Sequence, residues 1–264
     1  MKLTLDLSPY RLLAALIFFA AALVALDAVM QITTLVGGIA IPDGISRLVD
    51  LDQEESIGNW YSTMLLMLGA IFGFVIAFAH RISGKPYMIH WLGLGAAFMW
   101  LSLDEAIGIH EGTIEPVRNA LGTSGVLYYA WIIPAFVCVA AFGLLYLRFL
   151  GRLPGMFALL LIISGAVYVG SAGGLEMAEA PAMIRFGPDS FDARALPLLQ
   201  EALEMVGAAL YAFTLCLYMR RELNLSSITI GTPDAITIEA STQNDLSASP
   251  LPRRDMRLSR SPQT

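Results

Sequence analysis

Charged residues are scarce in this sequence of 264 residues. Asp, Glu, Lys and Arg together make up 14% of the chain, whereas soluble domains carry roughly 25%. Hydrophobic residues make up 56%, and many of them fall in runs long enough to cross a lipid bilayer. The composition therefore excludes an ordinary soluble domain and predicts an all-α, polytopic membrane protein.

Cysteine and histidine are also rare, with two and three residues respectively. Cys138 and Cys216 each lie inside an apolar run, without a second Cys or His at a metal-binding spacing, so we interpret both as small core residues. Zinc sites need several Cys or His ligands. We expect His80 and His90 to lie near the cytoplasmic ends of their helices, far from His110. The sequence therefore disfavours a His-rich zinc enzyme.

Several familiar enzyme motifs are missing as well. The sequence has no Ser-His-Asp arrangement, no phosphate-binding glycine loop and no dinucleotide-binding fingerprint. It supports neither a serine hydrolase nor a nucleotide-dependent enzyme, and we expect no nucleic-acid partner.

Six apolar stretches are long enough to span a bilayer, by the criterion of about 20 residues. They predict a transmembrane domain over residues 1–221, with helices at about 10–36, 59–79, 88–112, 126–149, 155–179 and 195–219. The first stretch continues past any signal-peptide cleavage site, so we expect it to be retained as a helix. Residues 222–264 are rich in Ser, Thr, Pro and Asp and predict a disordered cytoplasmic tail. The alternating pattern at 227–239 is compatible with a small hairpin within that tail.

Positive charge is distributed unevenly between the two sides of this predicted bundle. Of the 16 Lys and Arg residues, only Arg47, Arg118, Arg185 and Arg194 fall on the side opposite the termini. Because basic residues are retained on the cytoplasmic side of a membrane, both termini are predicted to be cytoplasmic. We expect a bacterial-type plasma (inner) membrane.

Acidic residues from most of these helices reach one level near the extracytoplasmic face, counting 1.5 Å for each helical residue. Glu176 and Glu179 share one helix face, and so do Glu201 and Glu204, because each pair is separated by three positions. Carboxylates that meet where water is scarce repel one another. We therefore expect a bound cation, a shared proton or arginine partners to stabilise this layer.

The segment LSLDEAIGIHEG, residues 101–112, brings four ionisable side chains into the same layer. Ionisable residues inside a membrane are usually functional, so His110 and Glu111 are predicted as catalytic acid/base groups. Oxygen-rich sites favour Mn²⁺, Fe²⁺, Mg²⁺ or Ca²⁺ over Zn²⁺. The candidate ligands of such a divalent metal are Asp104, His110, Glu111, Glu176, Glu179, Glu201 and Glu204, with Asp27, Glu55 and Glu105 as additional candidates.

Three functions fit these predictions. The favoured one is a metal-dependent membrane enzyme that acts on a lipid or a small extracytoplasmic substrate. The second is a cation or proton-coupled carrier, which the near absence of ionisable residues in the cytoplasmic halves of the helices weakens. The third is a non-catalytic membrane subunit or sensor whose acids pair with arginines. The sequence leaves the substrate, the reaction and the oligomeric state open.

Overall fold

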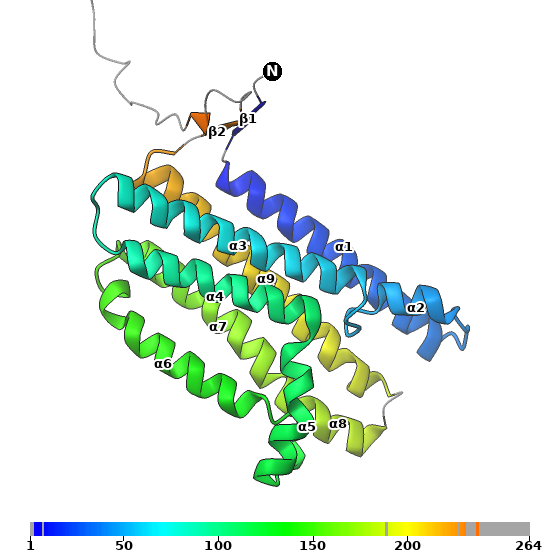
Figure 1. Cartoon of the computed structure of the whole chain (residues 1–264). Helices are drawn as coiled ribbons and strands as arrows, with labels where there is room; N and C mark the ends of the chain where they lie inside the picture. The colour runs from blue at the N-terminus through cyan, green and yellow to red at the C-terminus, as the bar shows by residue number, and fades with distance from the viewer. Residues whose placement is uncertain (1–2, 7, 188–189, 226, 231–235, 238–264) are drawn as a thin grey trace, which may run out of the picture.

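The computed structural model describes residues 3–6, 8–187, 190–225, 227–230 and 236–237. Six long helices run along one bundle (Figure 1): α1 (Pro9–Leu35), α3 (Ile57–Ile82), α4 (Met88–Ile107), α6 (Ile132–Leu150), α7 (Gly155–Gly174) and α9 (Phe191–Glu222). The shorter elements are α2 (Asp43–Val49), α5 (Ile109–Leu121), the 3₁₀ helix η1 (Gly125–Leu127) and α8 (Glu176–Phe186), together with strands β1 (Leu3–Asp6), β2 (Ser227–Ile230) and β3 (Ile236–Thr237).

The long elements confirm the predicted helical fold. Within the described residues, five helical segments are long and apolar enough to cross a membrane, and a sixth qualifies if α4 and α5 count as one span. These two helices meet at an angle of 81°. The predicted continuous helix over residues 88–112 therefore breaks, because Gly108 adopts a left-handed backbone conformation with φ of 59° between them.

Local sequence signals explain where several helices begin. Pro9 occupies the first turn of α1, where its missing N–H is not needed. The Ser56 hydroxyl accepts a hydrogen bond from the backbone N–H of Asn59 at 3.0 Å and caps α3. Ser190 caps α9 in the same way, through the N–H of Ala193 at 3.2 Å. These caps satisfy backbone donors that the helices themselves leave unpaired.

Helix α9 forms the centre of the bundle. It packs against α1, α3, α7 and α8, and α4 packs against the outer side of α3. Met205 and Leu215 of α9 are fully buried. The backbones of α3 and α4 approach closely at Gly73 and Gly95, where a Cβ on Gly73 would lie 2.8 Å from the Gly95 Cα. Large side chains cannot separate the two helices there.

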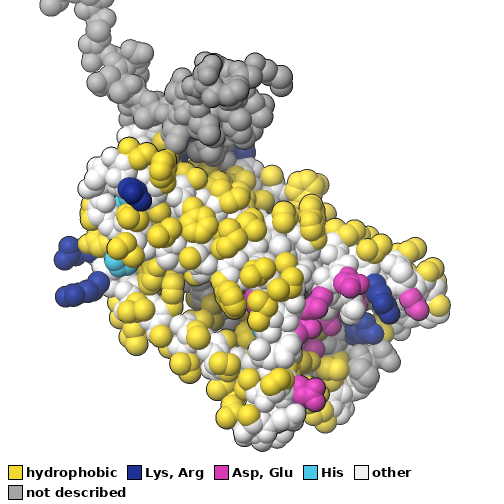
Figure 2. Space-filling model, viewed as in Figure 1, with side chains coloured by type: hydrophobic (Ala, Val, Ile, Leu, Met, Phe, Trp, Pro, Cys, Tyr) yellow, Lys and Arg dark blue, Asp and Glu magenta, His cyan; other side chains and the backbone are white. Residues whose placement is uncertain are grey.

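Helix α6 lies at the edge of the bundle (Figure 1), and its side chains reach α4 through Tyr146 and α7 through Phe136. Many of its apolar side chains are exposed, among them Val137, Leu144 and Leu145. Figure 2 shows that hydrophobic side chains also cover most of the remaining face. An apolar exterior around a helical core is what a bilayer requires. Cys216 is buried as predicted, whereas Cys138 of α6 is exposed, so its prediction as a core residue is wrong.

The two ends of the bundle differ. A three-stranded antiparallel sheet in the order β1-β2-β3 lies at the end where α1 begins (Figure 1). Strands β2 and β3 confirm the small hairpin, and the sequence did not indicate that β1 would pair with β2. The other residues of the predicted tail, 226, 231–235 and 238–264, lie outside the described residues. Helices α2, α5 and α8 lie at the opposite end, toward which acidic side chains gather in Figure 2.

Candidate functional site

A cavity of about 320 Å³ lies at the end of the bundle formed by α2, α5 and α8. Its walls come from the segment before α3, from α3, α4, α5, α7, α8 and α9, and from the segment before α6. We call this cavity the acidic pocket. No Lys or Arg is found among its described lining residues, which include nine acids: Asp52, Glu54, Asp104, Glu105, Glu111, Glu176, Glu179, Glu201 and Glu204.

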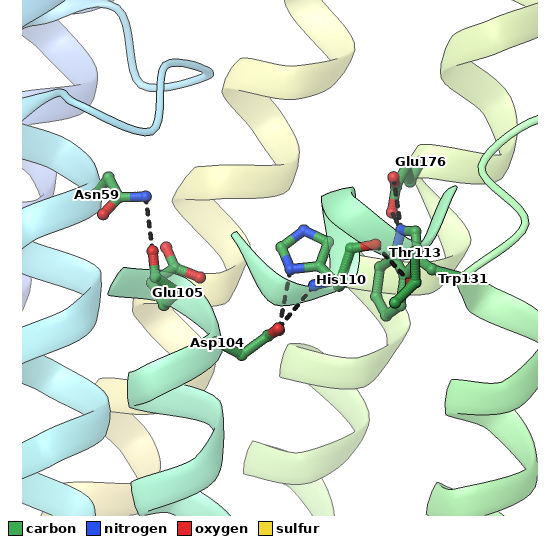
Figure 3. A network of polar contacts seen from close by, with 7 residues as sticks. All are labelled: Asn59, Asp104, Glu105, His110, Thr113, Trp131 and Glu176. Carbon is green, nitrogen blue, oxygen red and sulfur yellow. Dashed lines mark hydrogen bonds and ion pairs between the residues drawn. The ribbon is translucent and has the colours of Figure 1, made fainter. Parts of the chain in front are cut away.

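The break between α4 and α5 brings His110, the only histidine among the described lining residues, into the wall of the acidic pocket. Asp104 lies one turn before the end of α4, and the bend at Gly108 turns His110 back toward it. The backbone N–H of His110 donates to Asp104 Oδ1 at 2.8 Å, and the His110 ring Nδ1 lies 2.9 Å from Asp104 Oδ2. In Figure 3 the other ring nitrogen of His110 points away from Asp104. Asp104 therefore fixes the orientation of the imidazole.

Two aromatic donors hold the carboxylates of α8. The Trp131 Nε1–H lies 2.8 and 2.9 Å from the two carboxylate oxygens of Glu176, whose side chain is only 7% exposed (Figure 3). The Tyr129 hydroxyl donates to Glu179 Oε1 at 3.0 Å. Burial and the neighbouring Glu179 charge raise the pKa of Tyr129, so the hydroxyl keeps its proton and remains a donor. The Trp131 ring also lies 4.8 Å from the ring of His110.

Helix α9 contributes a second pair of acids from the centre of the bundle. Glu201 and Glu204 both line the acidic pocket, and Glu204 is 8% exposed. Gln200 of the same helix lines the pocket with them. Across the pocket, the Asn59 side chain donates to the backbone oxygen of Glu105 at 3.0 Å and ties α3 to α4 (Figure 3). The Glu105 carboxylate is close enough to both α9 acids for mutual repulsion.

The segment before α3 contributes two acids that the sequence analysis did not place in the site. Glu54 lies against Gly108, where a Cβ would collide with its carboxylate. Burial and the neighbouring charge of Glu54 raise the pKa of Glu111 above its ordinary value. Asp52 lines the same pocket, and withdrawal from bulk water together with the charge of Glu179 raises its pKa to about 7.

Asp27 and Asp50 have structural roles outside the pocket lining. Asp27 of α1 is 1% exposed, and its carboxylate accepts hydrogen bonds from the Leu51 backbone N–H at 3.1 Å and from Gln31 Nε2 at 3.2 Å. Asp50 lies 3.8 Å from an Arg194 guanidinium nitrogen. These contacts fix the segment that carries Asp52 and Glu54, so Asp27 acts on the pocket through that segment.

The structure brings most of the predicted site residues together. All seven predicted metal ligands and Glu105 line the acidic pocket, whereas Asp27 and the exposed Glu55 do not. The sequence analysis missed Asn59, Tyr129, Trp131, Tyr168 and Gln200, which also line the pocket. Neutral polar and aromatic side chains are common in helices, so only the fold distinguishes these five.

The acids are spread around the wall of the pocket. Within the part of the chain that the structure describes, no group of three or more His, Cys, Asp or Glu side chains is already arranged to hold a metal ion. The bonds from His110, Trp131 and Tyr129 direct three of the carboxylates toward protein donors. A cation in this pocket would have to draw ligands together from opposite walls.

Comparisons with known proteins connect this pocket to a family. Searches against curated proteins and against solved structures gave no match. A family model described as a domain of unknown function, DUF8692, matches residues 15–218. This match extends from α1 to α9 and includes every residue that lines the acidic pocket. The chain therefore belongs to the DUF8692 family.

Proposed function

We propose that the protein is an integral membrane protein with six spans and both termini in the cytoplasm, and that the acidic pocket binds a divalent cation near the extracytoplasmic face. The apolar exterior of α6 and the length of the helices support the membrane assignment. The uneven distribution of Lys and Arg supports the orientation and a bacterial-type inner membrane.

The composition of the pocket wall carries the proposal. Nine carboxyl groups and no described Lys or Arg line a single cavity. Such a wall is stabilised by bound positive charge or by bound protons, because neighbouring carboxylates repel one another. Carboxylate and amide oxygens are the donors that Mn²⁺, Fe²⁺, Mg²⁺ and Ca²⁺ accept. The cavity is large enough for a cation that keeps part of its hydration shell, so the carboxylates need not close completely around it.

We further propose that His110 and Glu111 supply acid/base chemistry beside this cation. Asp104 holds the His110 ring through Nδ1, so that the second ring nitrogen is available for proton transfer. This arrangement suits a metal-dependent membrane enzyme. Its substrate would be a lipid or a small extracytoplasmic molecule.

The alternative function, a non-catalytic subunit or sensor, would require the acids of the pocket to pair with arginines, and the positions of the arginines support this less well than cation binding. Arg194 is within 3.8 Å of Asp50, which lies outside the pocket lining. Arg118 and Arg185 stack on the rings of Tyr128 and Phe186. The Arg194 charge also acts on Asp52 of the pocket wall, but one positive charge cannot balance nine acids.

Equilibrium dialysis with Mn²⁺ and Ca²⁺ tests cation binding in the purified protein. Glu111→Gln removes an acid from the pocket wall, and Glu115→Gln is a matched control because Glu115 is an exposed acid on the same helix outside the lining. The proposal predicts that binding weakens in Glu111→Gln and is unchanged in Glu115→Gln. Equal binding by both variants and the wild type, or no binding at all, would contradict it.

A further inference from the structure

A second cavity, of about 300 Å³, lies beside the start of α1, at the end of the bundle that carries the three-stranded sheet (Figure 1). The acidic pocket lies at the opposite end, and cation binding there makes no use of this space. We call the second cavity the N-terminal cavity. Its described lining residues come from β1, the start of α1, α3 and α9, and they are Asp6, Ser8, Arg11, Leu12, Phe72 and Cys216.

The inner part of the N-terminal cavity is apolar. Leu12 lies one turn further into α1 than Ser8, because an α-helix has about 3.6 residues per turn. Phe72 of α3 and Cys216 of α9 are buried in the same wall, with 7% and 0% of their surface exposed. This part of the cavity therefore accepts a hydrocarbon group and offers no partner to a strongly hydrated ion.

The outer part of the N-terminal cavity contains charges of both signs. Asp6 Oδ1 lies 3.7 Å from an Arg220 guanidinium nitrogen, and the Asp6 side chain is 62% exposed, so its carboxylate can accept a further donor. Arg11 is exposed and has no hydrogen-bond or ion-pair partner among the described residues. The Ser8 hydroxyl does not cap α1, so it can donate to an anion at this helix start, where the macrodipole also favours negative charge. A ligand with one anionic and one cationic group thus finds a partner for each.

The sequence of α1 indicates the level of this cavity in a membrane. After Arg11 the helix carries no charged side chain until Asp27, so the apolar part of the span begins directly beyond the cavity. Tyr10 is 64% exposed, and an exposed tyrosine beside a basic residue is typical of the membrane–water interface. In the proposed orientation this interface faces the cytoplasm. The N-terminal cavity therefore lies at the level of the head groups in the cytoplasmic leaflet.

We propose that the N-terminal cavity binds a phospholipid whose head group ends in a primary amine, as in phosphatidylethanolamine. The lipid phosphate contacts the Arg11 guanidinium and the Ser8 hydroxyl, and the lipid ammonium group donates to the Asp6 carboxylate. The glycerol and the first part of an acyl chain pack against Leu12 and Phe72, while the rest of the chain remains in the bilayer. This site rests on the proposed membrane assignment and orientation, and it is independent of cation binding in the acidic pocket.

The two charges and the apolar wall distinguish this lipid from other candidates. A choline head group has no N–H to donate to Asp6, and a glycerol head group brings no cation at all. Inorganic phosphate would contact Arg11 but would leave the apolar wall unused. A phosphate next to an amine on one lipid uses all three features, so the affinity of the site should depend on the head group.

Native mass spectrometry of the purified, delipidated full-length protein in mild detergent measures this preference. Phosphatidylethanolamine, phosphatidylcholine and phosphatidylglycerol with identical acyl chains are added separately, and glycerophosphoethanolamine serves as the soluble head group. We expect one tightly bound phosphatidylethanolamine for each wild-type chain, with roughly tenfold weaker binding of the other two lipids because one charge-assisted hydrogen bond is lost. The soluble head group should bind more weakly than phosphatidylethanolamine, because it lacks the acyl chains.

Two substitutions test the two charges of the site separately. Arg11→Gln should weaken phosphatidylethanolamine binding about tenfold, because the phosphate loses its charged partner. Arg81→Gln is the matched control, because Arg81 is an exposed arginine in the last turn of α3, at the same end of the bundle, and does not line the cavity. Asp6→Asn should abolish the preference for phosphatidylethanolamine over phosphatidylglycerol, because the ammonium group loses its charged acceptor. Arg11 and Asp6 are both exposed, so both variants should fold.

Equal affinities of the wild type for all three lipids, or equal phosphatidylethanolamine binding by the wild type and Arg11→Gln, overturn the proposal. Binding of the soluble head group as tightly as the lipid also overturns it. Equilibrium dialysis of the same preparations with Mn²⁺ separates this inference from the proposed function. Mn²⁺ binding without Arg11-dependent lipid binding overturns the lipid site alone, whereas the reverse result upholds the lipid site and overturns cation binding.

Discussion

Asp104 contacts His110 with both of its carboxylate oxygens, one through the backbone N–H at 2.8 Å and one through the ring Nδ1 at 2.9 Å. This double contact spans the break between α4 and α5, so the same aspartate stabilises the bend and orients the imidazole. Its side chain is 18% exposed, which limits screening by solvent.

Replacement of Asp104 should therefore destabilise the fold locally. Asp104→Ala removes both acceptors, and hydrogen bonds to charged groups contribute about 1.5–3 kcal/mol. Asp104→Asn keeps one acceptor, so we expect a smaller loss. Thermal unfolding in mild detergent measures the effect, with Glu115→Gln as the control. Identical unfolding midpoints for the wild type and both Asp104 variants would show that the contact contributes nothing to stability.

Gly108→Ala should disturb the same bend from the other side. A left-handed backbone costs a non-glycine residue about 1–2 kcal/mol, and the new methyl group would displace the Glu54 carboxylate. We expect a lower unfolding midpoint. The double variant Gly108→Ala, Glu54→Ala should recover only the part of the lost stability that the collision with Glu54 causes. Gly112→Ala is a suitable control, because nothing lies within 4 Å of a Cβ there. Equal midpoints for the two single variants would contradict this explanation.

The raised pKa of Asp52 should make the stability of the folded protein depend on pH. Its pKa rises from 3.8 to about 7 in the folded protein, first through desolvation and then through the charges of Glu179 and Asp50. The folded state therefore holds this proton more tightly than the unfolded state, and Asp52 reduces stability as the pH rises from 3.8 to about 7. Above that range the destabilisation is complete.

Asp52→Asn should remove this effect, because an amide does not titrate. We expect the variant to unfold at a higher temperature than the wild type above pH 7, with the difference disappearing near pH 4. Unfolding midpoints measured across this range test the prediction, with Glu55→Gln as a control in the same segment. A constant difference at every pH would mean that titration of Asp52 is not the cause.

Asp27 should affect stability without contributing to cation binding. In Asp27→Ala the buried N–H of Leu51 loses its acceptor, which costs about 1–3 kcal/mol. Because Asp27 is not part of the pocket wall, the cation stoichiometry of the folded variant should equal that of the wild type. Loss of the cation in a variant that still unfolds like the wild type would instead make Asp27 a ligand.

The sequence predicted the level of the acids better than their contacts. Helical rise alone brought Asp104, Glu176 and Glu204 to one layer, and all three line the pocket. Helical rise also assigned Asp27 to this layer. In the structure, however, the Asp27 carboxylate faces the Leu51 backbone instead of the pocket. Depth in a bundle follows from residue number, whereas the direction of a side chain depends on how each helix is rotated against its neighbours.

The break at Gly108 limited the prediction in a different way. A glycine inside an apolar run is compatible with a straight helix, so the sequence favoured one helix over residues 88–112. Only the packing of Glu54 and the Asp104–His110 contact select the bent form.

Elemental analysis of the purified protein beside Glu204→Gln tests cation binding most directly. Glu204 is 8% exposed and lines the pocket from the central helix, and its amide variant keeps the size of the side chain. After exposure to Mn²⁺, Fe²⁺, Zn²⁺ and Ca²⁺, we expect at least one Mn, Fe or Ca ion for each wild-type chain and a clear loss in the variant. A wild-type protein that retains no metal after all four exposures, or a folded variant that retains the full amount, would contradict the account.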